Sequence, residues 1–391
     1  MGMIRPVRTE PTAEVKTDTA IASHFATLTD PRIERTKRHK LVDIVTIAIC
    51  STLSLGESWE AMEEFGQTHE AWLRKFLELP NGIPSHDTFN RVFSRIDPQE
   101  FRTCFIAWVK SLEPTLAGDI IPIDGKTLRG SRDRANGHKA IHMVSAWASS
   151  SSLVLGQLKT DGKSNEITAI PKLLDLLEIK GCVVSIDAMG CQTKIAKKII
   201  EKQADWVFCL KGNQSTFHED VKAHFGSLDL EQLRQDPRVF LETHDQGHGR
   251  RETRRYYYLT DHPLTSYAES WSGFQGIGLV ESLRDNGQKV TLERRYFIAT
   301  LSRGVNAFAN AVRSHWGIEN SLHWVLDVSF SEDANRTRQG HAAENFAILR
   351  HIALNILRKD TTSKKSINLR RLRAGWDTAY LQQLLQILQT S

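Results

Sequence analysis

The chain of 391 residues is long enough for two or three domains with a sizeable core. Its 51 basic and 46 acidic residues give a formal charge of +5, so total charge alone does not indicate a polyanionic partner. The five cysteines form no C-x-x-C pair and no stretch reaches 18 apolar residues, which argues against a zinc site, a disulfide scaffold and a membrane partner. Because acidic residues replace a signal-peptide core near the N-terminus, we expect an unexported, cytoplasmic protein.

The first part of the chain predicts helices. Residues 1–18 have no periodicity and indicate a flexible tail, and residues 19–116 indicate a helical domain for DNA binding or dimerisation. Leu41–Leu55 is a nearly continuous apolar run, as in a buried helix, and Trp59–Leu79 has the three- and four-residue spacing of an amphipathic helix. Proline and glycine breakers then precede a short basic helix that begins near Ser85. This order fits DNA docking and a plain helical bundle equally well.

The pattern changes to short strands at Asp119. Three strands, a helix, a strand, a helix and a strand are expected, in chain order, at Ile120–Ile123, Ala140–Trp147, Leu153–Leu158, Asn165–Glu178, Cys182–Ile186, Lys194–Lys202 and Asp205–Leu210. This is the order of an RNase H-like mixed sheet with helices on both faces. Residues 227–302 are again rich in strands and indicate a β insertion, after which helices resume at Val305–Val325 and Ala342–Leu357.

Two acids directly follow apolar strands in this region. Asp124 ends a strand that is expected to stop at Gly125, and Asp187 follows Cys182–Ile186. The two strands are neighbours in an RNase H-like order, so the carboxylates would meet at one end of the sheet. Such a pair repels unless a cation lies between its members, which favours Mg²⁺, or Mn²⁺ in its place. Taken alone, however, Asp124 is explained more simply as a turn residue before a solvated basic loop.

A third acid is expected on a later helix that faces the same edge. His315, Glu319 and His323 recur one turn apart on one helix face, with Trp316 alongside. Polar groups stacked in this way beside aromatic residues favour a buried polar site. An amphipathic helix with a surface glutamate is the alternative.

Seven segments spread over nearly the whole chain carry a family resemblance: Asp30–Arg32, Ile123–Thr127, Lys163–Ile167, Ser185–Ala188, Leu210–Gln214, His315–Asn320 and Leu372–Asp377. Together they resemble the DDE-class transposases of insertion sequences, in the branch that includes the H-repeat-associated proteins. The resemblance implies an α/β (α+β) RNase H-like fold with a β-strand insertion before the last acidic helix and an all-α N-terminal domain. It also implies Asp124, Asp187 and Glu319 as the catalytic and metal-binding triad. The chain departs from the related Tyr-x2-Arg-x3-Glu-x6-Lys pattern, because Val312, His315 and Leu326 stand at the Tyr, Arg and Lys positions.

The implied activity is metal-dependent phosphoryl transfer on double-stranded DNA, without a covalent intermediate, by a protein that is a homodimer when bound to DNA. The residues expected to contact the DNA backbone are Lys126, Arg129, Lys211, Asn213, Gln214, Arg313, His315, Trp316 and His323. For Asn213 and Gln214 a helix-capping role is an equal alternative, and Glu166 is explained more simply as a helix N-terminal residue than as a fourth acid.

The expected division of the chain is a tail, a helical domain, a catalytic core interrupted by the insertion, and a basic C-terminal segment, at 1–18, 19–116, 117–226, 227–302, 303–360 and 361–391. Two other functions stay open at this point. One is a catalytically inactive or repurposed RNase H-like nuclease or DNA-binding protein. The other is a helical interaction protein with an appended β domain, which would hold Asp124 and Asp187 far apart.

Overall fold

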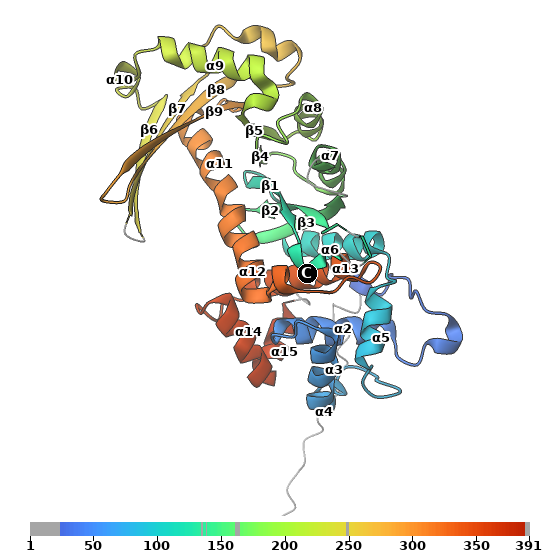
Figure 1. Cartoon of the computed structure of the whole chain (residues 1–391). Helices are drawn as coiled ribbons and strands as arrows, with labels where there is room; N and C mark the ends of the chain where they lie inside the picture. The colour runs from blue at the N-terminus through green and yellow to red at the C-terminus, as the bar shows by residue number, and fades with distance from the viewer. Residues whose placement is uncertain (1–23, 134–135, 138, 161–164, 248–249, 388–391) are drawn as a thin grey trace, which may run out of the picture.

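A nine-stranded mixed sheet runs through the molecule (Figure 1), in the order β3-β2-β1-β4-β5-β9-β8-β7-β6. The structure, a computed structural model, describes residues 24–133, 136–137, 139–160, 165–247 and 250–387, so the predicted tail and Lys163 and Ser164 lie outside it. The strands are β1 (Ile120–Thr127), β2 (His142–Ala148), β3 (Leu153–Thr160), β4 (Val183–Ile186), β5 (Asp205–Leu210), β6 (Phe240–Gly247), β7 (Arg250–Leu259), β8 (Gly276–Asp285) and β9 (Val290–Ala299).

The first five strands have the RNase H-like arrangement. β1 pairs antiparallel with β2 and parallel with β4, and β4 pairs parallel with β5. The predicted fold class is therefore confirmed, and every predicted strand is present within a few residues of its expected bounds. The sheet also excludes the helical interaction protein with an appended β domain.

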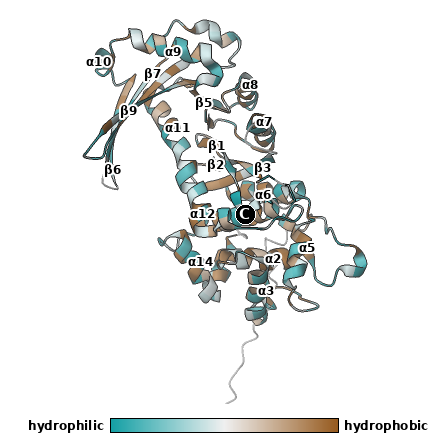
Figure 2. Cartoon of the chain, viewed as in Figure 1, coloured by the Kyte–Doolittle hydropathy of each residue, from teal (hydrophilic) through white to brown (hydrophobic). Residues whose placement is uncertain are grey.

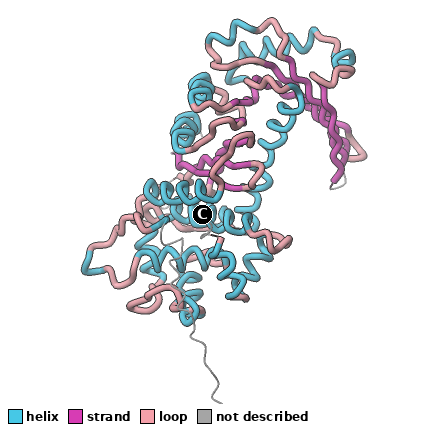
Figure 3. Tube along the Cα trace, turned by 180° about the vertical axis from the view of Figure 1, so that it is seen from behind, coloured by secondary structure: helices cyan, strands magenta, loops and turns pink. Residues whose placement is uncertain are grey.

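The predicted β insertion is not a separate layer. β9 pairs antiparallel with β5, from Val207 opposite Ala299 to Leu210 opposite Tyr296, so the inserted strands continue the same sheet. Figure 3 shows these long strands projecting away from the helical part of the molecule.

Helices cover both faces of the sheet and form the base of the molecule. They are α2 (Leu41–Leu53), α3 (Trp59–Thr68), α4 (Glu70–Leu73), α5 (His86–Phe93), α6 (Pro98–Leu112), α7 (Glu166–Leu176), α8 (Thr193–Glu201), α9 (Ser215–Ser227), α10 (Leu230–Leu233), α11 (Gly304–Ile318), α12 (Trp324–Phe330), α13 (Ala342–Lys359), α14 (Ile367–Trp376) and α15 (Thr378–Gln386). A π-helical turn, η6 (Glu319–His323), joins α11 to α12, and the three form one long helix from the inserted strands to the helical base (Figure 1).

Successive side chains of a strand point to opposite faces of the sheet, so each residue's position along the strand decides which helix it packs against. Ile120, Val183 and Val207 pack with α11, whereas Ile121, Val184 and other residues of the opposite face belong to the core shared with α7 and α8. Asp124 lies two and Asp187 four residues beyond Pro122 and Val183, so both carboxylates belong to the face that α11 covers.

Two local predictions are wrong. The helix expected over Trp59–Leu79 breaks after Thr68, where the ring of His69 lies 3.0 Å from the carbonyl oxygen of Phe65, and only the short α4 follows. The strand expected to stop at Gly125 continues to Thr127, because β2 pairs with it over that whole length. Asp124 thus lies inside β1, at the point where the parallel pairing with β4 ends.

The helical base and the catalytic sheet share one hydrophobic core. Trp59 of α3 stacks on Phe93 of α5 and packs edge-on against Phe346 of α13, with ring centres 5.3 and 5.1 Å away. In Figure 2, α2 is mostly coloured hydrophobic, as its complete burial requires. The five cysteines are free, and four of them are buried. Within the described ranges, no helix combines the length and apolar character needed to cross a bilayer.

Candidate active site

Asp124 and Asp187 come together through the pairing of β1 with β4. The parallel register places Ile123 beside Ile186, so the next residues along the two strands are the two aspartates. Burial raises the pKa of Asp124, the charge of His323 opposes this rise, and the charges of Asp187 and Glu166 add to it. An acid whose ionisation is opposed by a second acid beside it is in the electrostatic environment in which a cation is favoured.

The loop after β4 fixes the carboxylate of Asp187. Its Oδ1 accepts hydrogen bonds from the backbone N–H groups of Met189 and Gly190, at 3.0 and 3.3 Å. The amides of Asn213 and Gln214 donate to the carbonyl oxygens of Ala188 and Cys191, at 2.6 and 3.0 Å.

Asn213 and Gln214 hold the Asp187 loop by bonds to its backbone, one from each side-chain amide. Each NH2 group keeps a second donor, so their predicted contact with DNA stays a prediction. Neither of them caps α9, whose N-terminus has no side-chain cap. The sequence around Asn213 and Gln214 gave no signal for this role, because the loop that their amides bind is more than 20 residues away along the chain.

Glu319 lies at the first residue of the π-helical turn and is exposed. It lines a cavity of about 200 Å³ together with Asp187, Lys211, His315 and Trp316. The predicted helix therefore brings Glu319 and His315 to the same cavity as Asp187. π-helical turns occur preferentially at functional sites, and this one changes the spacing of side chains along the helix at Glu319.

The two histidines of this helix lie over different strands. His315 lies 3.3 Å from the hydroxyl of Ser185 in β4, and burial lowers its pKa, against the charges of Asp187 and Glu319. His323 lies 3.6 Å from the carboxylate of Asp124, and burial lowers its pKa as well. Its Nε2 is buried without a hydrogen-bond partner among the described residues. Both histidines thus reach the acids, which fits their selection from the helix face.

Lys126 does not fit its predicted role as a phosphate contact. Its side chain is 11% exposed, and its ammonium pairs with Asp327 and, at 2.6 Å, with the buried Glu332. Burial opposes the charged form, but these carboxylates outweigh it and raise the pKa of Lys126. Lys126 is a structural cation that ties β1 to the chain after α12.

The remaining predicted contacts are accessible. Arg129 is 83% exposed and lies 3.4 Å from Asp333. Arg313 pairs with Asp245 at 2.8 Å. Trp316 is 37% exposed, and the guanidinium of Arg295 stacks 4.4 Å from its ring centre.

A groove of about 470 Å³ continues from the acids between α11 and the inserted strands. It is lined by Glu319, Trp316 and four arginines, Arg254, Arg284, Arg295 and Arg313. Three of these arginines, Arg254, Arg284 and Arg295, were not predicted as site residues. The base-rich Arg250–Arg255 stretch was the available signal, but nothing local places β7 beside α11.

The donors present suit a hard divalent cation. Asp124 and Asp187 offer carboxylate oxygens at the ends of adjacent paired strands, and the charge of Asp187 adds to the rise in the pKa of Asp124. Over the part of the chain that is described, however, no three acidic, histidine or cysteine side chains are already gathered as a metal-binding group. The aspartate pair fits such a cation, and Glu319 lines the same cavity as Asp187.

Gly125 makes room for a buried pair behind Asp124. His142 Nε2 and Glu166 Oε1 lie 2.6 Å apart, and a Cβ on Gly125 would overlap both atoms. Glu166 is therefore more than the helix N-terminal residue expected from the sequence, since it also supports β1 through His142.

We expect Gly125→Ala to lower the free energy of unfolding by about 1–3 kcal/mol, because the added methyl forces this packed pair to move. Chemical denaturation measures the stability. Gly212→Ala is the matched control, because its Cβ would meet no atom within 4 Å. Equal stability of the two variants would contradict the packing argument.

Two family models and a similar curated protein agree on one family. A family model described as "Transposase DDE domain" matches residues 115–356, and one described as "DDE_Tnp_1-associated" matches residues 22–109. The "H repeat-associated putative transposase YhhI" of Escherichia coli K12 is 39% identical over 371 residues, covering 93% of this chain and 97% of that protein. An uncharacterised Xanthobacter autotrophicus protein, from the dhlA 3′ region, is 42% identical over 280 residues, covering 71% and 92%. A solved piggyBac transposase synaptic complex with hairpin DNA has a TM-score of 0.42 and 11% identity, covering 95% of this chain and 78% of that chain.

Proposed function

Because the chain belongs to the family of transposases with a DDE domain, we propose that it cleaves DNA at the inverted-repeat ends of an insertion sequence and joins the freed end to target DNA. The family assignment agrees with the resemblance found in the sequence. The observation that supports the proposal is the register of β1 and β4, which pairs Ile123 with Ile186, the residues before Asp124 and Asp187, while Glu319 lines the same cavity as Asp187.

The three acids are the proposed catalytic residues. Asp124 and Asp187 would hold a divalent cation, Mg²⁺ or Mn²⁺, with Glu319 completing the site from the long helix. When bound, such a cation supplies Lewis-acid stabilisation of the charge that develops on the phosphoryl group.

Other residues of the cavity would hold the DNA strand. Lys211 is exposed beside Asp187, and its ammonium is positioned to pair with a backbone phosphate. His315 is kept neutral by its lowered pKa, so it would act as a hydrogen-bonding group and not as a cation. Arg295 and Trp316 form the wall that leads into the groove lined by the four arginines. In that groove Arg313 would contact the DNA strand.

His323 and Arg129 would play smaller parts. His323 is close enough to Asp124 to orient that carboxylate, and its buried Nε2 has no hydrogen-bond partner among the described residues. Arg129 is held only by an exposed pair with Asp333, which a phosphate can replace at little cost. Because two transposon ends must be handled, the DNA-bound protein would be a homodimer acting on bacterial DNA in the cytoplasm.

A strand-transfer assay tests this proposal. The purified chain is given Mg²⁺, a duplex that carries the element's own terminal repeat with a precut 3′ end, and a supercoiled target plasmid. Joined products support transposase activity. If the protein cleaves an uncut end but does not join it to the target, it is a nuclease. If it neither cleaves nor joins, the interpretation that remains is an inactive DNA-binding protein.

A further inference from the structure

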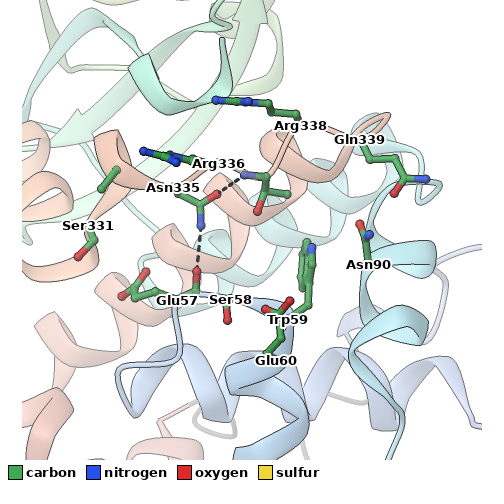
Figure 4. A pocket seen from close by; sticks show the side chains of 12 residues that line it. Glu57, Ser58, Trp59, Glu60, Asn90, Ser331, Asn335, Arg336, Arg338 and Gln339 are labelled. Carbon is green, nitrogen blue, oxygen red and sulfur yellow. Dashed lines mark hydrogen bonds between the residues drawn. The ribbon is translucent and has the colours of Figure 1, made fainter. Parts of the chain in front are cut away.

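Arg336 and Arg338 lie on an ordered segment between α12 and α13, outside the site described above. The amide of Asn335 donates to the carbonyl oxygen of Glu57 at 3.0 Å and accepts from the N–H of Thr337 at 3.0 Å (Figure 4). Arg338 Nε donates to the carbonyl oxygen of Gly130 at 3.2 Å. The segment is therefore fixed by the α2–α3 connection on one side and by the chain that follows β1 on the other.

The same segment also packs against the end of α5. The N–H of His341 donates to the carbonyl oxygen of Ser94 at 3.0 Å, and a Cβ on Gly340 would overlap that oxygen. Arg91 and Arg95 lie within three residues of Ser94 and are exposed. Backbone segments that are far apart in the sequence, each carrying exposed cations, thus lie side by side here.

We name as the basic patch the exposed cations of three converging segments: Arg91, Arg95, Arg132, Lys139, Arg336 and Arg338. None of them has an ion pair among the described residues. The neighbouring acids Asp333, Glu344 and Glu57 are already paired, with Arg129, Arg102 and Arg371. Glu60 is an exposed acid on the wall of the adjoining cavity, and Asp97 and Asp133 lie close to Arg95 and Arg132 along the chain, so the six cations of the patch outnumber these three acids.

Two hollows flank the segment and give the patch its shape. The first, of about 640 Å³, lies between the helical base and the segment, and Asn90, Arg336, Arg338 and Gln339 line it (Figure 4). The second, of about 430 Å³, is lined by Lys139, Lys159 and Arg338 on the other side. Their walls offer guanidinium, ammonium, amide and hydroxyl groups, which are the donors that bind phosphate oxygens.

We propose that the basic patch binds the backbone of duplex DNA that extends beyond the cleavage point. Cations spread over three chain segments match a repeating row of phosphates better than a single small anion. The patch also begins where the active site ends, since Gly130, which Arg338 contacts, lies six residues beyond Asp124. This inference rests on the proposed function, because it takes the DNA held at Asp124 and Asp187 as its ligand.

The test measures DNA binding by the full chain, in EDTA, so that no cleavage occurs. A labelled duplex of random sequence is titrated at several salt concentrations with the wild type and with a variant carrying Arg91→Gln, Arg95→Gln, Arg336→Gln and Arg338→Gln. Loss of four phosphate contacts is expected to weaken binding about 10- to 100-fold and to flatten the slope of log K against log salt by about 3 to 4.

Two control variants separate charge from structure. Lys172→Gln, Lys180→Gln, Lys194→Gln and Lys197→Gln remove four exposed charges on α7, α8 and the chain between them, and should leave affinity within about threefold. Arg336→Lys with Arg338→Lys keeps the charge and should retain the salt slope. Thermal unfolding of each variant verifies that it is folded.

The outcomes distinguish the two proposals. If the wild type cleaves and joins DNA but the four-glutamine variant binds as tightly as the control, the basic patch is not a DNA surface and the proposed function stands. If the wild type binds DNA through the patch but never cleaves, the proposed function fails instead. Equal competition by single-stranded RNA would overturn the assignment of duplex DNA.

Discussion

Asp187→Asn is expected to reduce cleavage of transposon-end DNA by about 10³-fold or more while DNA binding is unchanged. The asparagine keeps the shape of the side chain, and its Oδ1 can still accept the N–H groups of Met189 and Gly190, so the loop after β4 should keep its conformation. The lost property is the negative charge beside Asp124. Single-turnover cleavage with saturating DNA measures the chemical step, and Asp124→Asn should have the same effect.

A surface acid provides the comparison for this prediction. Asp175 lies on α7 and pairs with Lys198, away from the cavity, so Asp175→Asn should cleave at the wild-type rate. Wild-type cleavage by both Asp124→Asn and Asp187→Asn would remove these acids from the site. A loss in Asp187→Asn that is accompanied by a lower melting temperature would indicate a structural role.

Lys126→Met is expected to lower the free energy of unfolding by about 3–5 kcal/mol, because it leaves the carboxylate of Glu332 buried without its main counter-charge. Glu332 is 2% exposed at the side chain, and its pKa is lowered because the charges of Lys126 and Arg350 outweigh the effect of burial. Denaturant unfolding with several structural probes measures the loss.

Arg129→Met is the control for Lys126→Met. It removes a cation three residues away that is exposed, so it should cost less than about 1 kcal/mol. If Lys126→Met were as stable as the wild type but bound DNA more weakly, the ammonium would be a phosphate contact after all. The original interpretation of the sequence would then be restored.

The aspartate pair could be predicted because it depends on strand order. An apolar strand followed by an acid occurs at both Asp124 and Asp187, and an RNase H-like order makes the two strands neighbours. The spacing of His315, Glu319 and His323 on the later helix then predicted that Glu319 faces the same edge of the sheet. These inferences use short-range patterns together with one topological rule, and the sheet has that topology.

The role of Lys126 could not be predicted in the same way. A lysine two residues after an acid at a strand end is equally typical of a phosphate contact and of a solvated loop. Its actual partners, Asp327 and Glu332, are 201 and 206 residues further along the chain. The bonds that Asn213 and Gln214 make could not be predicted for the same reason, since the carbonyl groups they bind belong to another loop.

The pairing of β9 with β5 was also beyond local patterns. Alternating residues predicted that strands exist between residues 227 and 302, but alternation does not name the partner of a strand. The π-helical turn at Glu319 gave no sequence signal either, because the apolar spacing of Val305–Val325 is that of an ordinary helix.

The junction between β5 and β9 has a consequence for synthesis of the chain on the ribosome. β5 leaves the ribosome well before β9, so the nascent chain carries an open strand edge at Asp205–Leu210 until residues 290–299 have been added. Such an edge invites pairing with other chains. Fragments that end before residue 290 would keep it permanently, so premature termination of translation should yield aggregating, chaperone-dependent products instead of shorter functional proteins.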